Sequence, residues 1–374
     1  MAHDGCDLDR QWAGSYSPPM HRFTASHLHS ITRRTFSAAG ATHAIADEVA
    51  GILVGANLAG HDSHGVLRIP EYLRQAERGN LKMDAEPAVL AETATTLLID
   101  GDDGFGHYTA RRAMALAIDK ARGAAVCCAS LVRTGHIGRL GEYAEQAARA
   151  GCIGIVTVGW GQTGSGSTTP YGGARGAFGT NPIAFGVPTG DDAPFVVDYA
   201  TSMVAEGKLR VARSKGEDLP DGYIVDRNGV PSVKPGDFYD GGFLLPFGNH
   251  KGYALSMLTC LLGGLSGRFD VERGTMGGAY LQVIDVAAFT PLKSYQQGVR
   301  AFLDGIRRTP PAPGFDAVLV PGDFEHRSRA QRLVDGVEVP NTIYRQIEEC
   351  AGKLDVPLGE DAISASDLER YATE

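Results

Sequence analysis

The sequence predicts an α/β fold, with a middle region that alternates strands and helices and with helical segments at both chain ends. Three observations support this. Residues 96–158 alternate short apolar runs with helical patterns, the two ends show helical spacing, and hydrophobic and charged residues make up 43% and 21% of the 374 residues, as in globular proteins. The expected parts are a flexible extension at 1–20, a helical domain from 21–85 plus about 325–374, and an α/β region at 86–324.

The N-terminal part should begin with two helices, Thr24–Ala39 and Thr42–Leu58. In the second helix, apolar residues recur at a spacing that places them on one face. The sequence HDSHG at 61–65 then predicts a turn, and Pro70 fits the first turn of a third helix, where its missing N–H does little harm.

The middle region predicts a β-α-β unit with parallel pairing and a right-handed crossover, formed by strand Ala124–Val132, helix Arg139–Ala150 and strand Ile153–Val158. The further expected elements are strand Thr96–Asp100, helix Tyr108–Ala121, strand Pro194–Val197, helix Lys251–Leu265, strand Ala279–Ile284, helix Ser294–Ile306, strand Ala317–Val320 and helices within 325–350 and 361–371.

Composition narrows the possible partners. With 35 Lys and Arg against 44 Asp and Glu, the net charge of −9 argues against nucleic acid and anionic membranes. The sequence contains no run of 18 apolar residues, so it predicts no membrane-spanning helix. The six cysteines show neither a CxxC pair nor metal-ligand spacing, which favours reduced thiols and a cytoplasmic protein without a metal site.

Several motifs for other functions fail on their context. Gly159–Gly164 matches GxGxxG after a strand, but more Gly and Ser follow and no helix begins there, so a flexible or ligand-covering loop is favoured over a Rossmann phosphate loop. The chain contains neither GxSxG nor HExxH. A metal site at His61, Asp62 and His64 lacks candidates to support its ligands.

Two short segments combine groups suited to acid–base chemistry and anion binding. His64 lies in a turn after Ser63, and Arg68 could hold a carboxylate with two hydrogen bonds; alternatively they are a surface histidine and a salt-bridged arginine. His136 lies between glycines at a strand-to-helix junction, where ligands of open α/β folds bind, although it could simply cap the helix. Asp198 follows a strand and could orient a histidine, bind a ribose or cap a helix.

Seven motifs, in order, resemble the type-2 malate/L-lactate dehydrogenase family over roughly residues 20–350. They are AGHDSHGVLRIPEYL (59–73), RTGHIGRLGEYAEQAARAGCIGI (133–155), GTNPIAFGVP (179–188), VVDYATS (196–202), VDRNGVP (225–231), LLPFGNHKGYAL (244–255) and PGDFEHRSRAQRLVDGVEVP (321–340). The family includes sulfolactate, ureidoglycolate and diketogulonate enzymes and reductases of piperideine- and pyrroline-carboxylate. The resemblance implies a nicotinamide-binding fold that is not a Rossmann domain, NAD or NADP as cofactor, a small carboxylate substrate and a homodimer.

The resemblance also implies roles for individual residues. Imine reductases of the family use a Ser-His-Asp relay that falls on Ser63, His64 and Asp198, whereas ureidoglycolate dehydrogenases use a proton-transferring histidine that falls on His136. Arg68 matches the carboxylate clamp. Cofactor contacts are expected at His136, Ile137, Gly138, Arg139, Leu140, Asp198, Tyr199, Ala200, Leu244, Leu245, Gly322 and Asp323, with Thr180 and Asn181 shaping the pocket.

The sequence departs from the family pattern at two places. The Gly/Ser-rich loop at 159–173 replaces a usually shorter stretch that contacts the cofactor, so this loop is not assigned a cofactor contact. Tyr199 stands where the family often has Met. The implied reaction is hydride transfer between nicotinamide and C2 of a small 2-oxo or 2-hydroxy acid. Reduction of cyclic 2-imino acids is the alternative, and a Ser63-His64-Asp198 hydrolase is more remote. NAD and NADP both remain open, because Arg210, Arg213 and Lys215 could hold a 2′-phosphate or form a solvated basic face.

Overall fold

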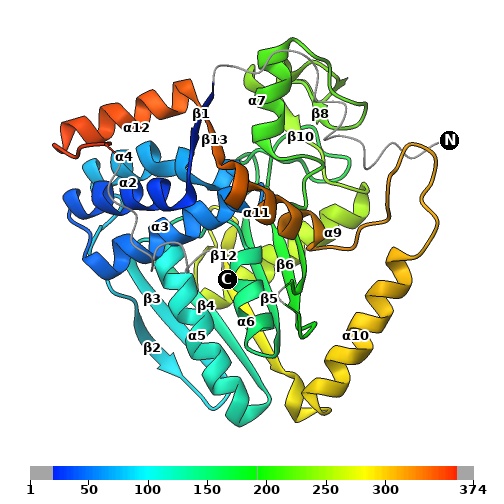
Figure 1. Cartoon of the computed structure of the whole chain (residues 1–374). Helices are drawn as coiled ribbons and strands as arrows, with labels where there is room; N and C mark the ends of the chain where they lie inside the picture. Colours follow the sequence, from blue (N-terminus) through cyan, green and yellow to red (C-terminus); the bar gives the residue numbers. More distant parts are fainter. Residues whose placement is uncertain (1–19, 192, 360–374) are drawn as a thin grey trace.

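The computed structural model describes residues 20–191 and 193–359, and it is built around one mixed sheet with helices on both faces (Figure 1). In spatial order the sheet consists of β2 (Ala88–Glu92), β3 (Thr96–Gly104), β4 (Val126–Thr134), β12 (Thr275–Asp285), β5 (Cys152–Gly161), β6 (Ile183–Val187) and β7 (Phe195–Tyr199), and β11 (Phe269–Asp270) pairs with β12. The prediction of an α/β fold is confirmed.

The predicted parallel pairing of the two strands in the β-α-β unit is wrong. Strands β4 and β5 do run in the same direction, but β12 lies between them and pairs antiparallel with both. Leu281 on β12 faces Ala129 on one side and Val156 on the other, and all three are buried. A strand from late in the chain therefore completes the centre of the sheet, which no local pattern around residues 124–158 could indicate.

Helices α5 (Gly106–Ala124) and α6 (Gly141–Arg149) cover one face of the sheet, and α9 (His250–Gly263) covers the other (Figure 1). A side chain at Gly154 would collide with Ala147 on α6, whereas one at Gly159 would collide with the backbone of Thr259 on α9. Glycine at 159 is thus required for close helix–sheet packing inside β5. This confirms that the GxGxxG sequence is no Rossmann phosphate loop.

A second core joins the two chain ends beside the sheet, at the upper left of Figure 1. It is formed by α2 (Ala25–Ala38), α3 (His43–Leu58), α4 (Ile69–Glu77), α12 (Asn341–Lys353) and a pair of antiparallel strands, β1 (Met20–Phe23) and β13 (Val337–Pro340). The side chains of Thr24 and Thr42 accept hydrogen bonds from backbone amides and thereby cap the first two helices. Residues 1–19 of the predicted extension lie outside the described residues.

The C-terminal part corrects two further predictions. Residues 317–320 form no strand, and 325–350 is not continuously helical. Helix α11 (Asp323–Asp335) stops at Gly336, whose φ of +86° suits glycine, and Val337 and Val339 are then buried in β13 before α12 begins. The non-local pairing of β13 with β1 overrides the helical pattern of the sequence. The predicted helix at 361–371 lies outside the described residues.

A small unit packs at one end of the sheet around Leu209, Ile224 and Leu244. It contains α7 (Glu206–Lys215), β8 (Ile224–Val225), β9 (Pro231–Ser232), α8 (Pro235–Tyr239) and β10 (Phe243–Leu244). Residues 167–169 of the Gly/Ser-rich loop form backbone hydrogen bonds with Leu244. On the far side of the sheet, α10 (Leu292–Arg307) projects at the lower right of Figure 1.

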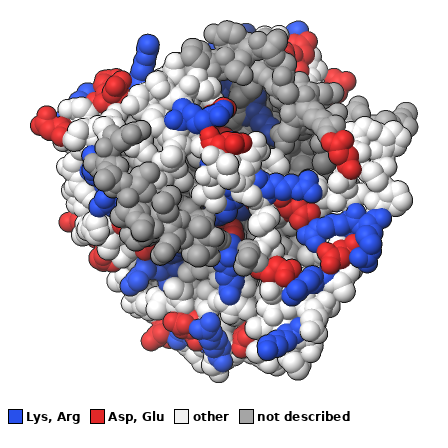
Figure 2. Space-filling view, in the orientation of Figure 1, with Lys and Arg blue, Asp and Glu red and all other residues white. Residues whose placement is uncertain are grey.

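The surface carries both signs of charge. On the face shown in Figure 2, Lys and Arg side chains are interspersed with Asp and Glu over the described residues. No described helix is both long and apolar enough to cross a membrane.

Candidate active site

The turn between α3 and α4 consists of two 3-10 helices, η1 (Asp62–His64) and η2 (Val66–Arg68), and Asn57 holds them together. The amide of Asn57 donates to Asp62 Oδ1 at 2.6 Å, and its Oδ1 accepts from the Val66 N–H at 2.9 Å. A side chain on Gly65 would overlap the Asn57 amide, so only glycine allows this approach. Asn57 therefore determines the shape of the turn that presents Ser63 and His64.

Helix α11 fixes the same turn from the other end of the chain. Arg332 bonds both carboxylate oxygens of Asp62, at 2.7 and 3.0 Å, and His61 Nε2 lies 3.0 Å from Glu325 Oε1. His61 and Asp62 are thus engaged in holding the turn. Among the described residues, no group of three or more His, Cys, Asp or Glu is arranged to hold a metal ion.

Ser63 and Arg68 lie beside His64 in the turn. Ser63 Oγ is 3.0 Å from His64 Nδ1, and Arg68 donates from Nε to the Ser63 carbonyl at 2.8 Å. Arg68 Nη1 forms an ion pair with Glu71 at 2.6 Å. The salt-bridged arginine considered in the sequence is therefore present, and within the described residues Nη2 of Arg68 remains available to a carboxylate.

His136 faces this turn from the loop between β4 and α6. The imidazoles of His64 and His136 stack with centroids 5.7 Å apart and an interplanar angle of 16°. Behind them, the Tyr72 hydroxyl lies 2.8 Å from His136 Nδ1 and 3.4 Å from Nε2 of His107. The structure thus brings the two predicted histidines together and adds two residues that the sequence reasoning missed. Tyr72 lies four residues after Arg68, on the same helix face, which could have indicated it.

The surroundings of both histidines favour the neutral imidazole. His64 is partly buried, and His136 is exposed. Desolvation, followed by the positive charge of neighbours such as Arg68, lowers the pKa of His64 to about 3 and that of His136 to about 4. A neutral imidazole can accept a proton from a substrate hydroxyl.

Arg139 and Asp198 form a second charged group behind the loop of His136. Asp198 Oδ2 accepts from the Gly141 N–H at 2.7 Å and lies 3.8 Å from Arg139 Nε. Arg139 is 3% exposed, and its guanidinium also faces Glu142 and Glu145 at 3.8 and 3.7 Å. Burial raises the pKa of Asp198, and the Arg139 charge opposes this shift.

The structure does not form the Ser63-His64-Asp198 triad in the described residues. The hydrogen bond of His64 joins Nδ1 to Ser63 Oγ, and the carboxylate of Asp198 accepts from the Gly141 N–H. In a nucleophilic triad the carboxylate would hold Nδ1 while Nε2 faced the serine. Ser63 therefore bonds Nδ1 of His64, the nitrogen that would bond Asp198 in a nucleophilic triad.

The other predicted cofactor residues gather along β7. Thr201 N–H donates to the Thr180 carbonyl, the Met203 N–H donates to Leu245, and a side chain on Gly322 would collide with Pro194 next to β7. Tyr199 is 40% exposed, its ring edge against Phe247 with centroids 5.5 Å apart.

Some predicted cofactor side chains already have structural partners. Asn181 is buried and bonds Ser256 through Nδ2 and Trp160 N–H through Oδ1. Asp323 forms an ion pair with Arg307 at 2.7 Å. Leu244 is buried in the core of the small unit. Arg210 pairs with Glu206, and Arg213 lies over the Tyr239 ring.

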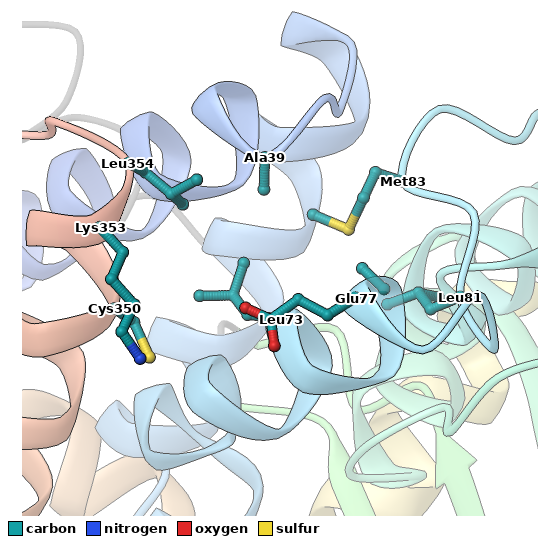
Figure 3. A pocket seen from close by; sticks show the side chains of 9 residues that line it. Ala39, Leu73, Glu77, Leu81, Met83, Cys350, Lys353 and Leu354 are labelled. Carbon is teal, nitrogen blue, oxygen red and sulfur yellow. The ribbon is translucent and has the colours of Figure 1, made fainter.

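A mainly apolar pocket of about 370 Å³ lies elsewhere, between α4, α12 and the end of α2 (Figure 3). Its lining consists of Ala39, Leu73, Ala76, Glu77, Leu81, Met83, Cys350, Lys353 and Leu354. None of the candidate site residues lines this pocket.

Comparison with known proteins places these features in a family context. Residues 23–348 match the model of a family described as malate/L-lactate dehydrogenase. The chain is 35% identical to hydroxycarboxylate dehydrogenase B of Escherichia coli O157:H7, over 90% of this chain and 95% of that protein.

Two solved structures are also similar. Sulfolactate dehydrogenase from Methanocaldococcus jannaschii has a TM-score of 0.83 at 29% identity, covering 90% of this chain and 98% of that one. Delta1-piperideine-2-carboxylate reductase from Pseudomonas syringae has a TM-score of 0.76 at 32% identity, covering 88% and 100%.

Proposed function

Because the chain belongs to the malate/L-lactate dehydrogenase family and is therefore an oxidoreductase, we propose that it transfers hydride between NAD or NADP and C2 of a small 2-oxo or 2-hydroxy acid. The observation that carries the proposal is the meeting of Arg68 with the stacked imidazoles of His64 and His136. A carboxylate held by the guanidinium would place the neighbouring C2 oxygen beside a group able to exchange a proton.

Arg68 is suited to hold the substrate because its own position is fixed. Bonds from Nε to the Ser63 carbonyl and from Nη1 to Glu71 orient the guanidinium plane, so little conformational entropy is lost when Nη2 meets a carboxylate. The Glu71 charge partly offsets the arginine, which keeps the site from binding every anion strongly.

The residues along β7 fit a nicotinamide dinucleotide. The exposed ring of Tyr199 offers an aromatic face to a planar group. Gly138, with φ of +70°, is needed for the loop before α6 to pack against His107, because a side chain there would collide with that imidazole. When bound, the cofactor supplies or accepts the hydride. The protein's own part is to orient both reactants and to manage the proton.

In the oxidation direction, a neutral imidazole receives the proton of the C2 hydroxyl. The lowered pKa values of His64 and His136 favour the neutral imidazole near neutral pH, so either is a candidate for the base. The resulting cation would be stabilised by the bound substrate carboxylate, and Arg68 would oppose it. The two histidines therefore remain competing candidates for the same proton.

Reduction of cyclic 2-imino acids is the second candidate, and one observation favours it. Ser63 Oγ lies 3.0 Å from His64 Nδ1, which supplies two members of the relay expected for an imine substrate. The similarity to the piperideine-2-carboxylate reductase structure supports the same candidate weakly.

We also propose a homodimer as the working form. Helix α9 exposes Met257, Leu258, Leu261 and Leu265, which share one side of the helix and its extension. An apolar strip of this kind on a helix packed against β5 is suited to contact a second copy. Sedimentation equilibrium tests this, and a Leu261→Glu variant should shift the protein toward monomer.

The proposed activity is tested by following nicotinamide absorbance with purified protein. NADH and NADPH are assayed separately with pyruvate, oxaloacetate, 2,3-diketogulonate, pyrroline-2-carboxylate and piperideine-2-carboxylate. Turnover of open-chain acids supports the first proposal, and turnover of only the cyclic compounds supports the second. Absence of both turnover and cofactor binding would overturn both.

A further inference from the structure

The Tyr72 hydroxyl connects two histidines behind the substrate side of the site. It lies 2.8 Å from His136 Nδ1 and 3.4 Å from His107 Nε2. Tyr72 is 2% exposed and His107 is fully buried, whereas His136 is exposed. The three side chains therefore form a hydrogen-bonded chain that leads from the protein interior to His136.

The number of protons in this chain is set by burial. Desolvation raises the pKa of Tyr72 far above its ordinary value and lowers the pKa of both histidines. At neutral pH the phenol keeps its proton and each imidazole carries one N–H. Both hydrogen bonds can then form in only two ways. Either His107 Nε2–H donates to the Tyr72 hydroxyl, which donates to His136 Nδ1, or His136 Nδ1–H donates to the hydroxyl, which donates to His107 Nε2.

The surroundings of His107 favour the first direction. His107 Nδ1 is buried and has no hydrogen-bond partner among the described residues. In the reverse direction this nitrogen would carry a buried N–H without an acceptor, which is rarer in proteins than a buried acceptor without a donor. The shorter of the two contacts, at 2.8 Å, is also the length typical of a hydroxyl donor, which places the Tyr72 proton on the side of His136.

We propose that Tyr72 and His107 are positioning residues that hold neutral His136 as the tautomer protonated at Nε2. On the proposed function, on which this inference rests, His136 then presents an N–H donor to the C2 oxygen of a 2-oxo acid. The donor polarises the carbonyl toward hydride addition without needing a cationic imidazole. Because Nε2 of this tautomer already carries a proton, exchange of the C2 hydroxyl proton then falls to His64.

Nitrogen NMR of the full chain labelled with ¹⁵N-histidine tests the tautomer without any substrate. Long-range correlations from the carbon-bound ring protons, which do not exchange with water, identify the protonated nitrogen, and a His136→Gln variant assigns the signal. We expect a protonated Nε2 and an unprotonated Nδ1 at His136. A protonated Nδ1 would overturn the inference.

Variants test whether the hydrogen bonds of Tyr72 and His107 determine the tautomer of His136. Tyr72→Phe should mix the two tautomers of His136, whereas Tyr280→Phe, which removes another largely buried hydroxyl at Cys128, should leave them unchanged. His107→Gln keeps a side-chain N–H donor and should preserve the Nε2–H form, whereas His107→Leu should not. An unchanged His136 signal in both Tyr72→Phe and His107→Leu would contradict the assignment.

Kinetics separate this inference from the proposed function. With an active substrate, Tyr72→Phe should lower kcat about 10–100-fold, as is typical when the partner orienting a functional histidine is lost, with KM changed little. His107→Gln should restore most of the turnover lost in His107→Leu. A protein without turnover on any substrate but with the Nε2–H signal would refute the function and keep the tautomer. An active protein whose His136 carries its proton on Nδ1 would keep the proposed function and refute the tautomer.

Discussion

Two walls of the site hold their functional groups in different ways. The turn wall, residues 61–72, uses short direct bonds between partly exposed groups, such as Arg332 to Asp62 at 2.7 Å. The loop wall, residues 135–145, depends on Arg139, whose guanidinium is buried and faces carboxylates at 3.7–3.8 Å without a hydrogen bond among the described residues. Direct bonds between polar groups therefore fix the turn wall, whereas the loop wall combines the bonds of Gly141 and His136 with a balance of buried charge around Arg139.

Replacing one histidine from each wall should give the largest effect. We expect His136→Gln and His64→Gln each to lower kcat about 10²–10⁴-fold while cofactor binding survives, because proton transfer or polarisation of the C2 oxygen is lost and the dinucleotide contacts remain. Steady-state kinetics and fluorescence titration with NADH or NADPH measure the two quantities. His43→Gln, at the exposed start of α3, is the control. A histidine variant with wild-type turnover would remove that wall from proton transfer.

Arg139→Met should destabilise the protein more than any comparable change in the turn wall. It leaves Glu142, Glu145 and Asp198 without their shared positive charge, and removal of one partner from a buried ion pair costs about 3–5 kcal/mol. Arg149→Met removes a more exposed partner of Glu145 and should cost at most about 1 kcal/mol. Urea denaturation compares the free energies of unfolding. Equal losses in the two variants would show that charge balance does not hold the loop wall.

Arg68→Ala should act mainly on substrate binding. A charged hydrogen bond contributes about 1.5–3 kcal/mol, so KM should rise about 10–150-fold with a smaller change in kcat. Arg74→Ala on the same helix, with an exposed side chain, is the matched control. Unchanged KM and kcat in Arg68→Ala would exclude this arginine from the carboxylate site.

The last prediction concerns the dependence of stability on pH. The pKa values of His64 and His136 lie at about 3 and about 4 in the folded protein, against 6.5 in the unfolded chain. As pH falls from 6.5 toward 4, the unfolded chain binds protons that the folded protein does not, so the free energy of unfolding decreases. The His64→Gln/His136→Gln double variant should lose less Tm between pH 7 and pH 4.5 than the wild type. Parallel Tm profiles would contradict the neutral histidines.

Local signals in the sequence predicted local structure well. The caps at Thr24 and Thr42 follow from side chains that bond amides three residues away, so the starts of α2 and α3 could be predicted to within a residue. Strands β8 to β11 have only two residues each, too few to show periodicity. The position of β12 and the pairing of β1 with β13 join segments far apart in the chain, which no window of residues can reveal.

In the candidate active site, the residues could be predicted from local motifs, but the contacts between them could not. His64, Arg68 and His136 could be identified from short motifs, because each lies in a turn or junction with a recognisable composition. Their contacts could not. Tyr72 reaches His136 across 64 residues, and Arg332 reaches Asp62 across 270. Asp198 was expected to orient a histidine, bind a ribose or cap a helix, and folding places its carboxylate at the first N–H of α6, Gly141, and near Arg139.

The central place of β12 also has a consequence for how the chain is made. Strands β4 and β5 leave the ribosome more than 100 residues before β12 does, and until then their facing edges have no partner. Unpaired apolar strand edges are the surfaces through which nascent chains associate. We therefore expect completion of the sheet to be late and slow during synthesis, and truncation before residue 275 to yield chains that need a chaperone.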